Sequence, residues 1–417
     1  MKNSSFPFKN LYPRQKLYGK FYHLNFFLDL LLFKLKKNNN VKNYKDQLSK
    51  NFISENFYLL NHERIGIYLV IKELIGKCNK KEVIMSPYTI WDVVNMVILA
   101  GGKPVFVDLE RDDLSLNYDD VIKKFNNETL AILYTHYHFL SKNHAKIRKF
   151  AFEKNLFYLE DCAIFLGSNY LKSNNLNSNE YRFLSFGRSK FVSTFSGGAV
   201  LSNIKVNSLE GNSLTEPNLG WLILYFFKTA KLQVISNLFF FRTIFFWLIK
   251  FLISINFKKY NKLFDNDPSP VKHKFLPNNY LASISNFQAK SIALKIKNIE
   301  LDKKERLKKI NIYYDNLINV KELKLLKRNV LNDEVFLNFP IFLNNRDKLF
   351  LELLKKNFDC STYFYKNCNN LNIFNEYRVD LNNIDKIEKD ILILPAYPGY
   401  PEENIYMICK IIKDFLK

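Results

Sequence analysis

Short apolar runs and amphipathic segments alternate along the chain from about residue 63. Runs of this length indicate buried strands, and the segments between them place apolar residues at helical spacing. The pattern predicts strands at 83–85, 104–108, 130–136, 156–161, 183–186 and 197–203. It predicts helices at 64–76, 91–100 and 142–154, the first two ending at glycines.

This alternation of strands and helices is typical of an α/β fold with a mostly parallel sheet covered by helices on both faces. In such sheets, ligands bind beyond the carboxyl ends of the strands. Asp161 and Ser185 both lie at predicted strand ends. We therefore expect the chemistry of the protein at this edge of the sheet.

Residues 205–275 interrupt the pattern. Within them, 221–256 is apolar nearly all round, and Lys228, Lys231, Arg242 and Lys250 divide it. No uncharged run approaches the ~20 residues that a transmembrane helix needs. The stretch predicts either buried helices that pack on the core, the interpretation we favour, or helices in peripheral contact with a membrane surface.

The rest of the chain predicts a second, smaller unit. Residues 290–309 suggest one long helix with a solvated basic face. Beyond it, 335–343 and 391–398 are strand-like and 402–416 is helical. We expect an N-terminal extension over 1–50, a large domain over 51–312 that contains the 205–275 insertion, and a small C-terminal α/β domain over 313–417.

Composition narrows the class of protein. Hydrophobic residues make up 47% and charged residues 24%, as in a globular chain. The net charge of +22 either attracts anionic partners or reflects a general excess of lysine, and both interpretations stay open. No nucleic-acid motif is present, so nucleic acid is not an expected partner. An odd number of cysteines and no apolar leader predict a reducing, cytoplasmic location, with a peripheral inner-membrane position as the alternative.

Several motifs follow one another in a set order. They are Glu160-Asp161-Cys162-Ala163, Ser185 to Lys190 (SFGRSK), Gly197-Gly198-Ala199-Val200, and the stretches 83–95, 100–110 and 394–400. An acid after one strand and a lysine after a later one are common, so this spacing alone is weakly specific. Together, the motifs resemble the DegT/DnrJ/StrS family of nucleotide-sugar aminotransferases over 63–203, 275–300 and 390–417.

The resemblance implies fold type I of the pyridoxal-phosphate enzymes, with a large three-layer α/β/α domain and a small C-terminal domain. It implies pyridoxal 5'-phosphate as the cofactor, with Lys190 as the lysine that bonds it and Asp161 as the partner of the ring nitrogen. Ser185 and Arg64 match phosphate-binding positions, Trp91 lies near the ring-stacking position, and Asn279 lies near a segment that reaches across the dimer. The implied reaction transfers an amino group from glutamate to a keto-sugar nucleotide, for a surface glycan or an antibiotic sugar, in a homodimer.

Some positions depart from the family pattern. Glu63 stands where the family has a glycine beside the phosphate, and Ile164 and Leu166 replace a Gln and a His after the acid pair. These changes keep open a second hypothesis, in which the chain binds pyridoxal phosphate or a sugar nucleotide in a regulatory role. A dehydratase is disfavoured, because dehydratases of this family replace the lysine by histidine.

A pair of histidines raises the question of a metal. His136 and His138 follow a predicted strand, two residues apart. No cysteine or carboxylate stands at a convincing spacing from them, and His136 matches a histidine of the family. We therefore expect no metal site.

Overall fold

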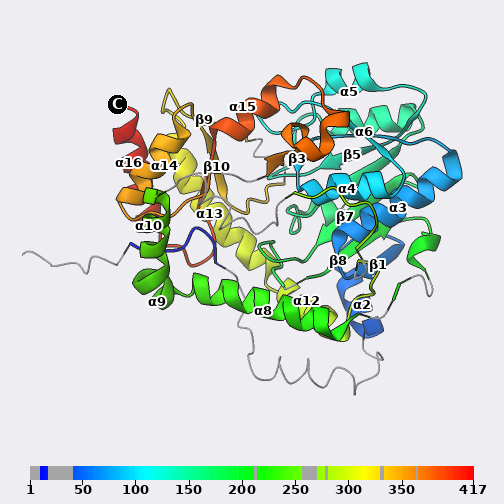
Figure 1. The fold of residues 1–417 in the computed structure, drawn as a ribbon, viewed down its shortest axis with the longest axis horizontal. Helices are drawn as coiled ribbons and strands as arrows, with labels where there is room; N and C mark the ends of the chain where they lie inside the picture. Colours follow the sequence, from blue (N-terminus) through cyan, green and yellow to red (C-terminus); the bar gives the residue numbers. More distant parts are fainter. Residues whose placement is uncertain are drawn as a thin grey trace, which may run out of the picture.

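The computed structural model describes residues 10–16, 41–173, 175–194, 196–210, 214–215, 217–255, 270–277, 280–328, 333–362 and 365–417. Asn279 and most of the predicted N-terminal extension lie outside these residues. The main sheet lies to the right in Figure 1 and the C-terminal sheet to the left, with a long helix between them.

The main sheet has seven strands in the order β1-β8-β7-β6-β5-β2-β4. The strands are β1 (Asn56–Leu60), β2 (Glu82–Met85), β4 (Lys103–Phe106), β5 (Thr129–Thr135), β6 (Phe157–Asp161), β7 (Glu180–Ser185) and β8 (Gly198–Ser202). Strands β4, β2, β5, β6 and β7 are parallel, as predicted. β8 runs antiparallel to β7, and the unpredicted β1 pairs antiparallel with β8. The fold is an α/β fold with a mostly parallel sheet, which confirms the predicted class.

Helices cover this sheet. They are α2 (Val41–Ser49), α3 (Glu63–Cys78), α4 (Trp91–Leu99), α5 (Tyr118–Lys124), α6 (His144–Glu153) and the short α7 (Tyr170–Ser173), followed by the 3-10 turn η2 (Asn207–Leu209). Among them, α3, α4 and α6 lie at the predicted places, whereas α2, α5 and α7 were not predicted. α3 packs closely on β7 and β8: a Cβ on Gly66 would lie 2.4 Å from Val200 Cγ2. The glycine therefore allows the helix to approach the strands that carry the site.

The C-terminal part forms a separate antiparallel sheet in the order β12-β10-β9. Its elements are β9 (Lys324–Leu325), β10 (Phe339–Phe342), α14 (Arg346–Lys355), η5 (Cys368–Asn370), η6 (Asn372–Tyr377), α15 (Asn382–Asp390), β12 (Ile391–Leu394) and α16 (Glu402–Phe415). One strand of this part, β11 (Lys366–Asn367), pairs with β3 (Tyr88–Thr89), which follows β2 of the main sheet. The predicted division into domains at 312–313 falls within a helix.

That region differs from the single solvated helix predicted over 290–309. The chain forms α12 (Asn286–Ile296) and α13 (Ile299–Leu317), and the basic side chains of Lys303, Arg306 and Lys309 are buried. Lys303 Nζ donates to Gly167 O at 3.0 Å and pairs with Asp333 at 2.7 Å. Arg306 donates to Leu337 O. The expectation was wrong for these three cations, which find carbonyl and carboxylate partners in the packed protein instead of water, whereas Lys297, Lys304 and Lys308 are exposed as predicted.

The apolar insertion forms a chain of helices along one side of the molecule (Figure 1). They are α8 (Leu219–Ser236), α9 (Leu238–Phe240), the π-helical turn η4 (Phe241–Phe245) and α10 (Phe246–Ile255). The prediction of buried helices holds for one face of these helices only. Phe246, Ile249 and Ile253 pack in the core, whereas only 22% of the window Leu238–Ile255 is buried. By length and composition alone, this window could also cross a membrane.

Candidate active site

The carboxyl ends of β6 and β7 bring two predicted site residues to one edge of the main sheet. β6 ends at Asp161 and β7 at Ser185, and the two strands are parallel neighbours. The Asp161 carboxylate is buried; it accepts a hydrogen bond from Ala163 N–H at 3.0 Å and one from the Thr135 hydroxyl at 3.5 Å. Asp161 is therefore held in a fixed position at this edge.

Lys190 lies in the loop between β7 and β8. Two backbone bonds close this loop: Phe186 N–H donates to Gly197 O at 2.9 Å, and Thr194 N–H donates to Phe186 O at 3.0 Å. Ser189, just before the lysine, adopts a left-handed backbone with φ of 63°, which is uncommon for a residue other than glycine. The loop thus turns sharply where Lys190 projects from it.

Glu63 lies among these side chains, at the first residue of α3. Its carboxyl is close enough to Asp161, Lys190 and Ser185 for all three to affect its ionisation, and its buried Oε1 has no hydrogen-bond partner among the described residues. Burial, and then repulsion from Asp161, raise the pKa of Glu63 well above its usual value, against the opposing effect of Lys190. Asp161, Ser185 and Lys190 therefore converge on one space, and Glu63 reaches into it.

A glycine fixes the position of Glu63. A Cβ on Gly198 would lie 2.2 Å from the backbone nitrogen of Glu63, closer than any real contact. The beginning of β8 and the beginning of α3 can therefore touch only because residue 198 is glycine. The Gly197-Gly198 pair of the sequence motif sets the distance between the lysine loop and the helix N-terminus.

Positive charge surrounds the N-terminus of α3. His62, Arg64 and Arg188 lie close together, and burial, Arg64 and Arg188 lower the pKa of His62 well below its usual value. A helix N-terminus with two guanidinium groups favours an anion such as a phosphate. From the insertion, Trp221 and Tyr225 pack on His62, with ring centroids 5.2 and 5.6 Å away.

Arg64 lies in the first turn of α3 and Trp91 at the first residue of α4, and each contacts residues outside the group around Lys190. Arg64 forms an ion pair with Asp92, which also accepts a hydrogen bond from the Tyr280 hydroxyl at 2.8 Å. Trp91 is buried at the start of α4, with its ring 5.7 Å from that of His273. Their roles in holding the phosphate and covering the ring stay predictions, as does that of Asn279.

Sequence reasoning missed an aromatic wall of the site. Tyr88, Tyr137 and Tyr365 form a cluster with ring centroids 5.8–6.0 Å apart, and Tyr365 interacts with both Asp161 and Glu63. Tyr365 precedes β11, so the β3–β11 pairing brings it to the site. No local pattern marks Tyr365, because only this long-range pairing gives it a role.

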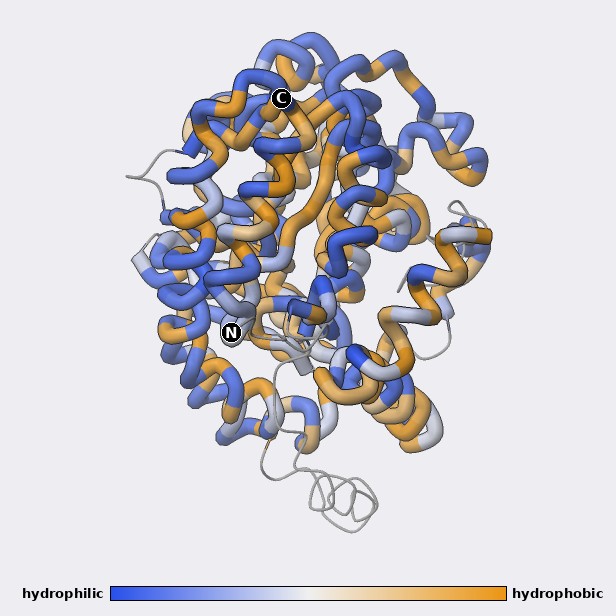
Figure 2. The backbone as a smooth tube through the Cα atoms, turned by 90° about the vertical axis from the view of Figure 1, so that its left-hand side faces the viewer, coloured by the Kyte–Doolittle hydropathy of each residue, from blue (hydrophilic) through white to orange (hydrophobic). Residues whose placement is uncertain are grey.

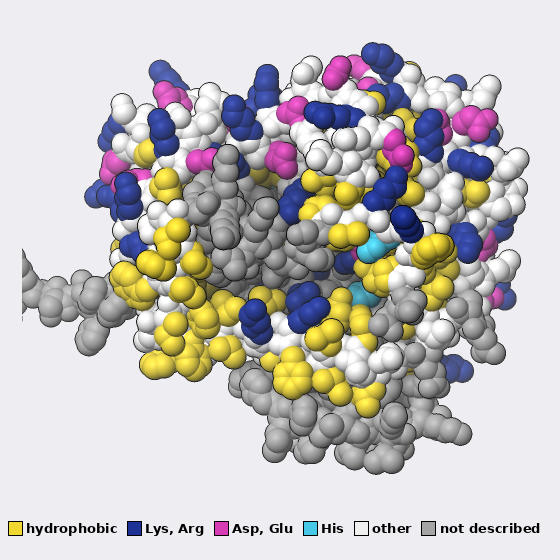
Figure 3. Space-filling model, viewed as in Figure 1, with side chains coloured by type: hydrophobic (Ala, Val, Ile, Leu, Met, Phe, Trp, Pro, Cys, Tyr) yellow, Lys and Arg dark blue, Asp and Glu magenta, His cyan; other side chains and the backbone are white. Residues whose placement is uncertain are grey.

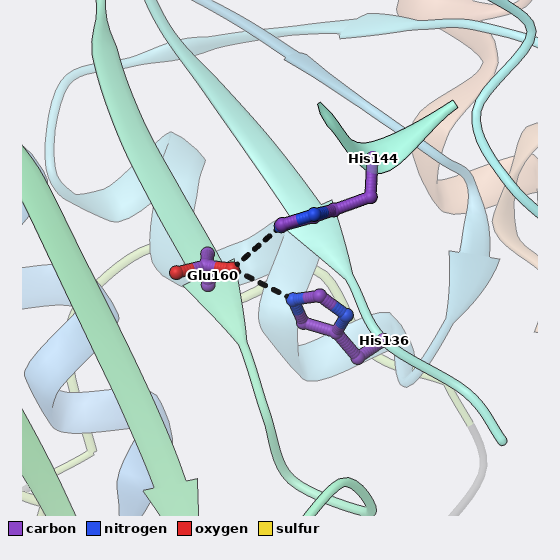
Figure 4. A group of neighbouring side chains, drawn as sticks. All are labelled: His136, His144 and Glu160. Carbon is purple, nitrogen blue, oxygen red and sulfur yellow. Dashed lines mark hydrogen bonds and ion pairs between the residues drawn. The ribbon is translucent and has the colours of Figure 1, made fainter. Parts of the chain in front are cut away.

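Glu160 precedes Asp161 in β6, so its side chain points to the opposite face of the sheet. There it lies at the centre of a buried polar cluster (Figure 4). Its Oε1 accepts from His136 Nε2 at 2.8 Å and His144 Nε2 at 3.0 Å, and its Oε2 pairs with Arg182 Nε at 2.8 Å. His136 therefore lies beside His144 and the carboxylate of Glu160, whereas the sequence pattern had suggested a pair of His136 with His138. Arg182 already neutralises Glu160, so a hydrogen-bonded structural role accounts for the cluster.

Substitution of Glu160 tests this role. Burial raises the pKa of Glu160, but Arg182 and the two histidines outweigh burial and hold it well below the usual value. Glu160→Gln should therefore destabilise the fold by about 3–5 kcal/mol at neutral pH, because it leaves Arg182 buried without a counter-charge. Because the folded-state pKa is depressed, this contribution is present above the unfolded pKa of Glu160 and is lost as the pH falls towards the folded-state value.

Denaturant unfolding measures the effect of this substitution. The exposed Glu128→Gln is the matched control and should unfold like the wild type. An unchanged unfolding midpoint for Glu160→Gln at neutral pH would contradict a structural role for the cluster.

Comparison with known proteins agrees with this geometry. The sequence model of the DegT/DnrJ/EryC1/StrS aminotransferase family matches residues 66–206 and 266–413. An uncharacterised protein of Methanocaldococcus jannaschii is 23% identical over 89% of each chain. The GDP-perosamine synthase of Escherichia coli O157:H7 is 28% identical over 39% of this chain and 46% of that protein.

Solved structures share the whole fold. AtS13 from Actinomadura melliaura superposes with a TM-score of 0.72 at 14% identity, over 97% of this chain and 98% of that one. The GDP-4-keto-6-deoxy-D-mannose-3-dehydratase of E. coli, solved with bound hydrated pyridoxal phosphate, gives a TM-score of 0.69 at 14% identity, over 96% and 98%. These likenesses identify the fold as type I of the pyridoxal-phosphate enzymes.

The class is therefore that of the pyridoxal-phosphate-dependent aminotransferases. Within it, the chain belongs to the DegT/DnrJ/EryC1/StrS family, because the family model matches more than half of its length. The predicted family, enzyme class and cofactor are confirmed.

The residues present suit the ring nitrogen and the phosphate of this cofactor, but one side chain near them does not fit it. The fixed carboxylate of Asp161 suits a ring nitrogen, and the cationic helix N-terminus suits a phosphate. The buried Nδ2 of Asn61, just before His62, has no partner among the described residues, so it is available as a further donor. Glu63 is the exception, because it brings a carboxyl close to Asp161, Ser185 and Lys190.

Proposed function

We propose that this chain transfers an amino group from glutamate to the keto carbon of a nucleotide-linked sugar. The convergence of Lys190 and Asp161 on the carboxyl of Glu63, in a member of this family, carries the proposal. The net charge of +22 supports an anionic substrate such as a nucleoside diphosphate sugar. The GDP-perosamine synthase to which the chain is similar is named after a nucleotide sugar.

Each residue has a defined task in this reaction. Bound pyridoxal phosphate supplies a ring that accepts the electrons released at the donor carbon. Asp161 would hold a proton on the ring nitrogen, and Ser185 with the N-terminus of α3 would hold the phosphate. Lys190 Nζ would hold the cofactor covalently at its aldehyde carbon, and as a free amine it would carry a proton to and from the substrate carbon. Tyr365 and Tyr137 would exclude water from one side.

A substrate screen tests the reaction directly. Purified protein saturated with pyridoxal phosphate is mixed with glutamate and a panel of keto-sugar nucleotides, and 2-oxoglutarate release is measured. Amino transfer to at least one of the sugars is expected. Transfer from glutamate only to simple keto acids would overturn the proposed acceptor. The regulatory alternative is not favoured, because the lysine and its acid are both present in a family of aminotransferases.

We further propose a homodimer in a reducing, cytoplasmic compartment. All five cysteines are free, and Cys162, Cys360, Cys368 and Cys409 are buried, as expected for thiols that are kept reduced. Light scattering of the holoenzyme measures the oligomeric state; a monomer at working concentrations would contradict the dimer.

Glu63 is expected to weaken cofactor binding. Once Glu63 is ionised, Glu63→Gly should lower the Kd for pyridoxal phosphate about tenfold, because it removes a repulsion of about 1.4 kcal/mol from the phosphate. The pKa of Glu63 is raised, so its charge and its repulsion grow as the pH rises. Wild-type affinity should therefore fall with pH relative to the variant.

Glu63→Gln separates charge from size in this test. The amide keeps the length of the side chain without the charge, so the pH-dependent part of the gain should persist in this variant. The part of the gain in affinity that comes from removing the bulk of the side chain should appear only in Glu63→Gly. If neither variant binds pyridoxal phosphate more tightly than the wild type at any pH, Glu63 does not oppose the cofactor.

A further inference from the structure

The insertion helices α8 to α10 present an apolar face to solvent. On α9 to α10 the large exposed side chains follow helical spacing and are apolar: Phe240, Ile244, Trp247, Leu248, Phe251 and Ile255. The exposed polar side chains between them, Thr243 and Ser254, are small and uncharged. Phe239 and Phe251 are 68% and 60% exposed. Figure 2 shows this run as a mostly hydrophobic stretch of backbone. A monomeric soluble protein rarely leaves so continuous an apolar surface uncovered.

The opposite face of the same helices is anchored to the protein. Phe241, Phe246 and Ile249 pack into the main core. Arg242 Nε donates to Leu11 O at 3.0 Å, and Lys250 Nζ donates to Asn357 Oδ1 at 3.0 Å. A helix that crosses a membrane would have to break these contacts and bury both cations. The segment is therefore built to lie on a surface, with one face in the protein and one face out.

Charge selects the kind of surface. Residues 219–255 contain no aspartate or glutamate and four basic residues. On α8, the exposed Lys228 and Lys231 lie on the same face as Leu224, Phe227 and Val234. Figure 3 shows hydrophobic side chains gathered over these helices with basic ones among them. Lysines between apolar side chains suit anionic headgroups above an acyl layer.

We propose that the outer face of α8 to α10 docks the enzyme on an anionic phospholipid surface. Phe239, Trp247 and Phe251 insert into the headgroup–acyl boundary, and Lys228 and Lys231 bind lipid phosphates. The surface is separate from the reaction at Lys190, although Trp221 and Tyr225 at the beginning of α8 contact His62 beside the site. Docking would therefore hold the side of the site formed by Trp221 and Tyr225 close to the membrane.

Vesicle co-sedimentation tests the proposal. Holoenzyme is mixed with vesicles of phosphatidylcholine alone or with phosphatidylglycerol, at low and high salt. We expect binding to the anionic vesicles only, weakened at least about fivefold by 1 M salt, which screens the lysines. The fluorescence of Trp247 should shift to the blue on binding, because its exposed ring leaves water.

Matched variants separate the two contributions. Phe239→Ser with Phe251→Ser should lower vesicle binding more than about tenfold at any salt. Lys228→Gln with Lys231→Gln should lower it about tenfold at low salt only. Ile122→Ser, at an apolar position 42% exposed on α5, is the control and should bind like the wild type. All variants change exposed side chains, so circular dichroism should show the fold unchanged.

Three outcomes would overturn the proposal. One is failure of the wild type to bind anionic vesicles. Another is concentration-dependent self-association that Phe239→Ser with Phe251→Ser abolishes, which would make the face an interface between copies of the chain. The third is retention in membranes after alkaline carbonate extraction, which would mean that the segment spans the bilayer. None of these results depends on amino transfer, so the docking surface and the proposed reaction fail separately.

Discussion

Replacing Lys190 with alanine is expected to abolish amino transfer, with turnover at least about 10⁴-fold lower. The variant loses both the covalent bond to the cofactor and the amine that moves the proton, and proton transfer alone is worth about 10²–10⁴-fold. Its loop is closed by backbone bonds from Phe186 and Thr194, so the loop should keep its shape without the lysine. Stopped-flow measurement with glutamate gives the loss in the first half-reaction.

Three controls make this result specific. The exposed Lys205→Ala should leave the rate unchanged. Added methylamine should restore part of the activity of Lys190→Ala, because it supplies the missing amine. Borohydride reduction followed by peptide mapping should find the cofactor on Lys190 in the wild type. Labelling at the partly buried Lys295, whose pKa is lowered to about 8 by desolvation, would show that the assignment is wrong.

Asp161→Asn is expected to lower turnover about 10³-fold while the cofactor stays bound. The amide keeps the shape of the carboxyl but cannot hold a proton on the ring nitrogen, and loss of one charge from a buried pair costs about 3–5 kcal/mol. Ala163 N–H can still donate to the remaining side-chain oxygen, and the new amide nitrogen can donate to the Thr135 hydroxyl in place of the second oxygen. Single-turnover kinetics with glutamate measure the loss.

The exposed Asp119→Asn is the matched control and should react at the wild-type rate. The expected pattern is a normal content of bound cofactor, seen by its visible absorbance, with slow chemistry. A wild-type rate in Asp161→Asn would remove the aspartate from the reaction. Loss of the cofactor without slower chemistry in the reloaded enzyme would assign it a binding role only.

The sequence predicted the charged part of the site because that part is local. β6 and β7 end in Asp161 and Ser185, and parallel strands bring their carboxyl ends together. The SFGRSK motif at 185–190 then places Lys190 in the loop that follows β7. The direction of the Glu63 side chain was not predictable in this way, since the sequence suggested only a charge near the phosphate. Its contact with Asp161 depends on how closely Gly198 lets α3 approach β8.

Other features depend on partners far away in the sequence. Lys303 and Arg306 have a pattern typical of a solvated helix face, but they are buried against Gly167, Asp333 and Leu337. In 221–256, an apolar pattern on all sides could not distinguish a buried helix from a half-exposed one. Only the packing of α10 on the core separates its inner face from its outer face.

The short pairing of β3 with β11 ties the two sheets together at the catalytic edge. Tyr365 lies one residue before β11 and so belongs to the C-terminal part, whereas Tyr88 lies in β3 and Tyr137 follows β5 of the main sheet. A fragment that ends after the main sheet would keep Glu63, Asp161 and Lys190 but leave them open to water on one side. Completing the barrier around the reacting groups therefore requires the chain to be synthesised as far as residue 367, about seven eighths of its length.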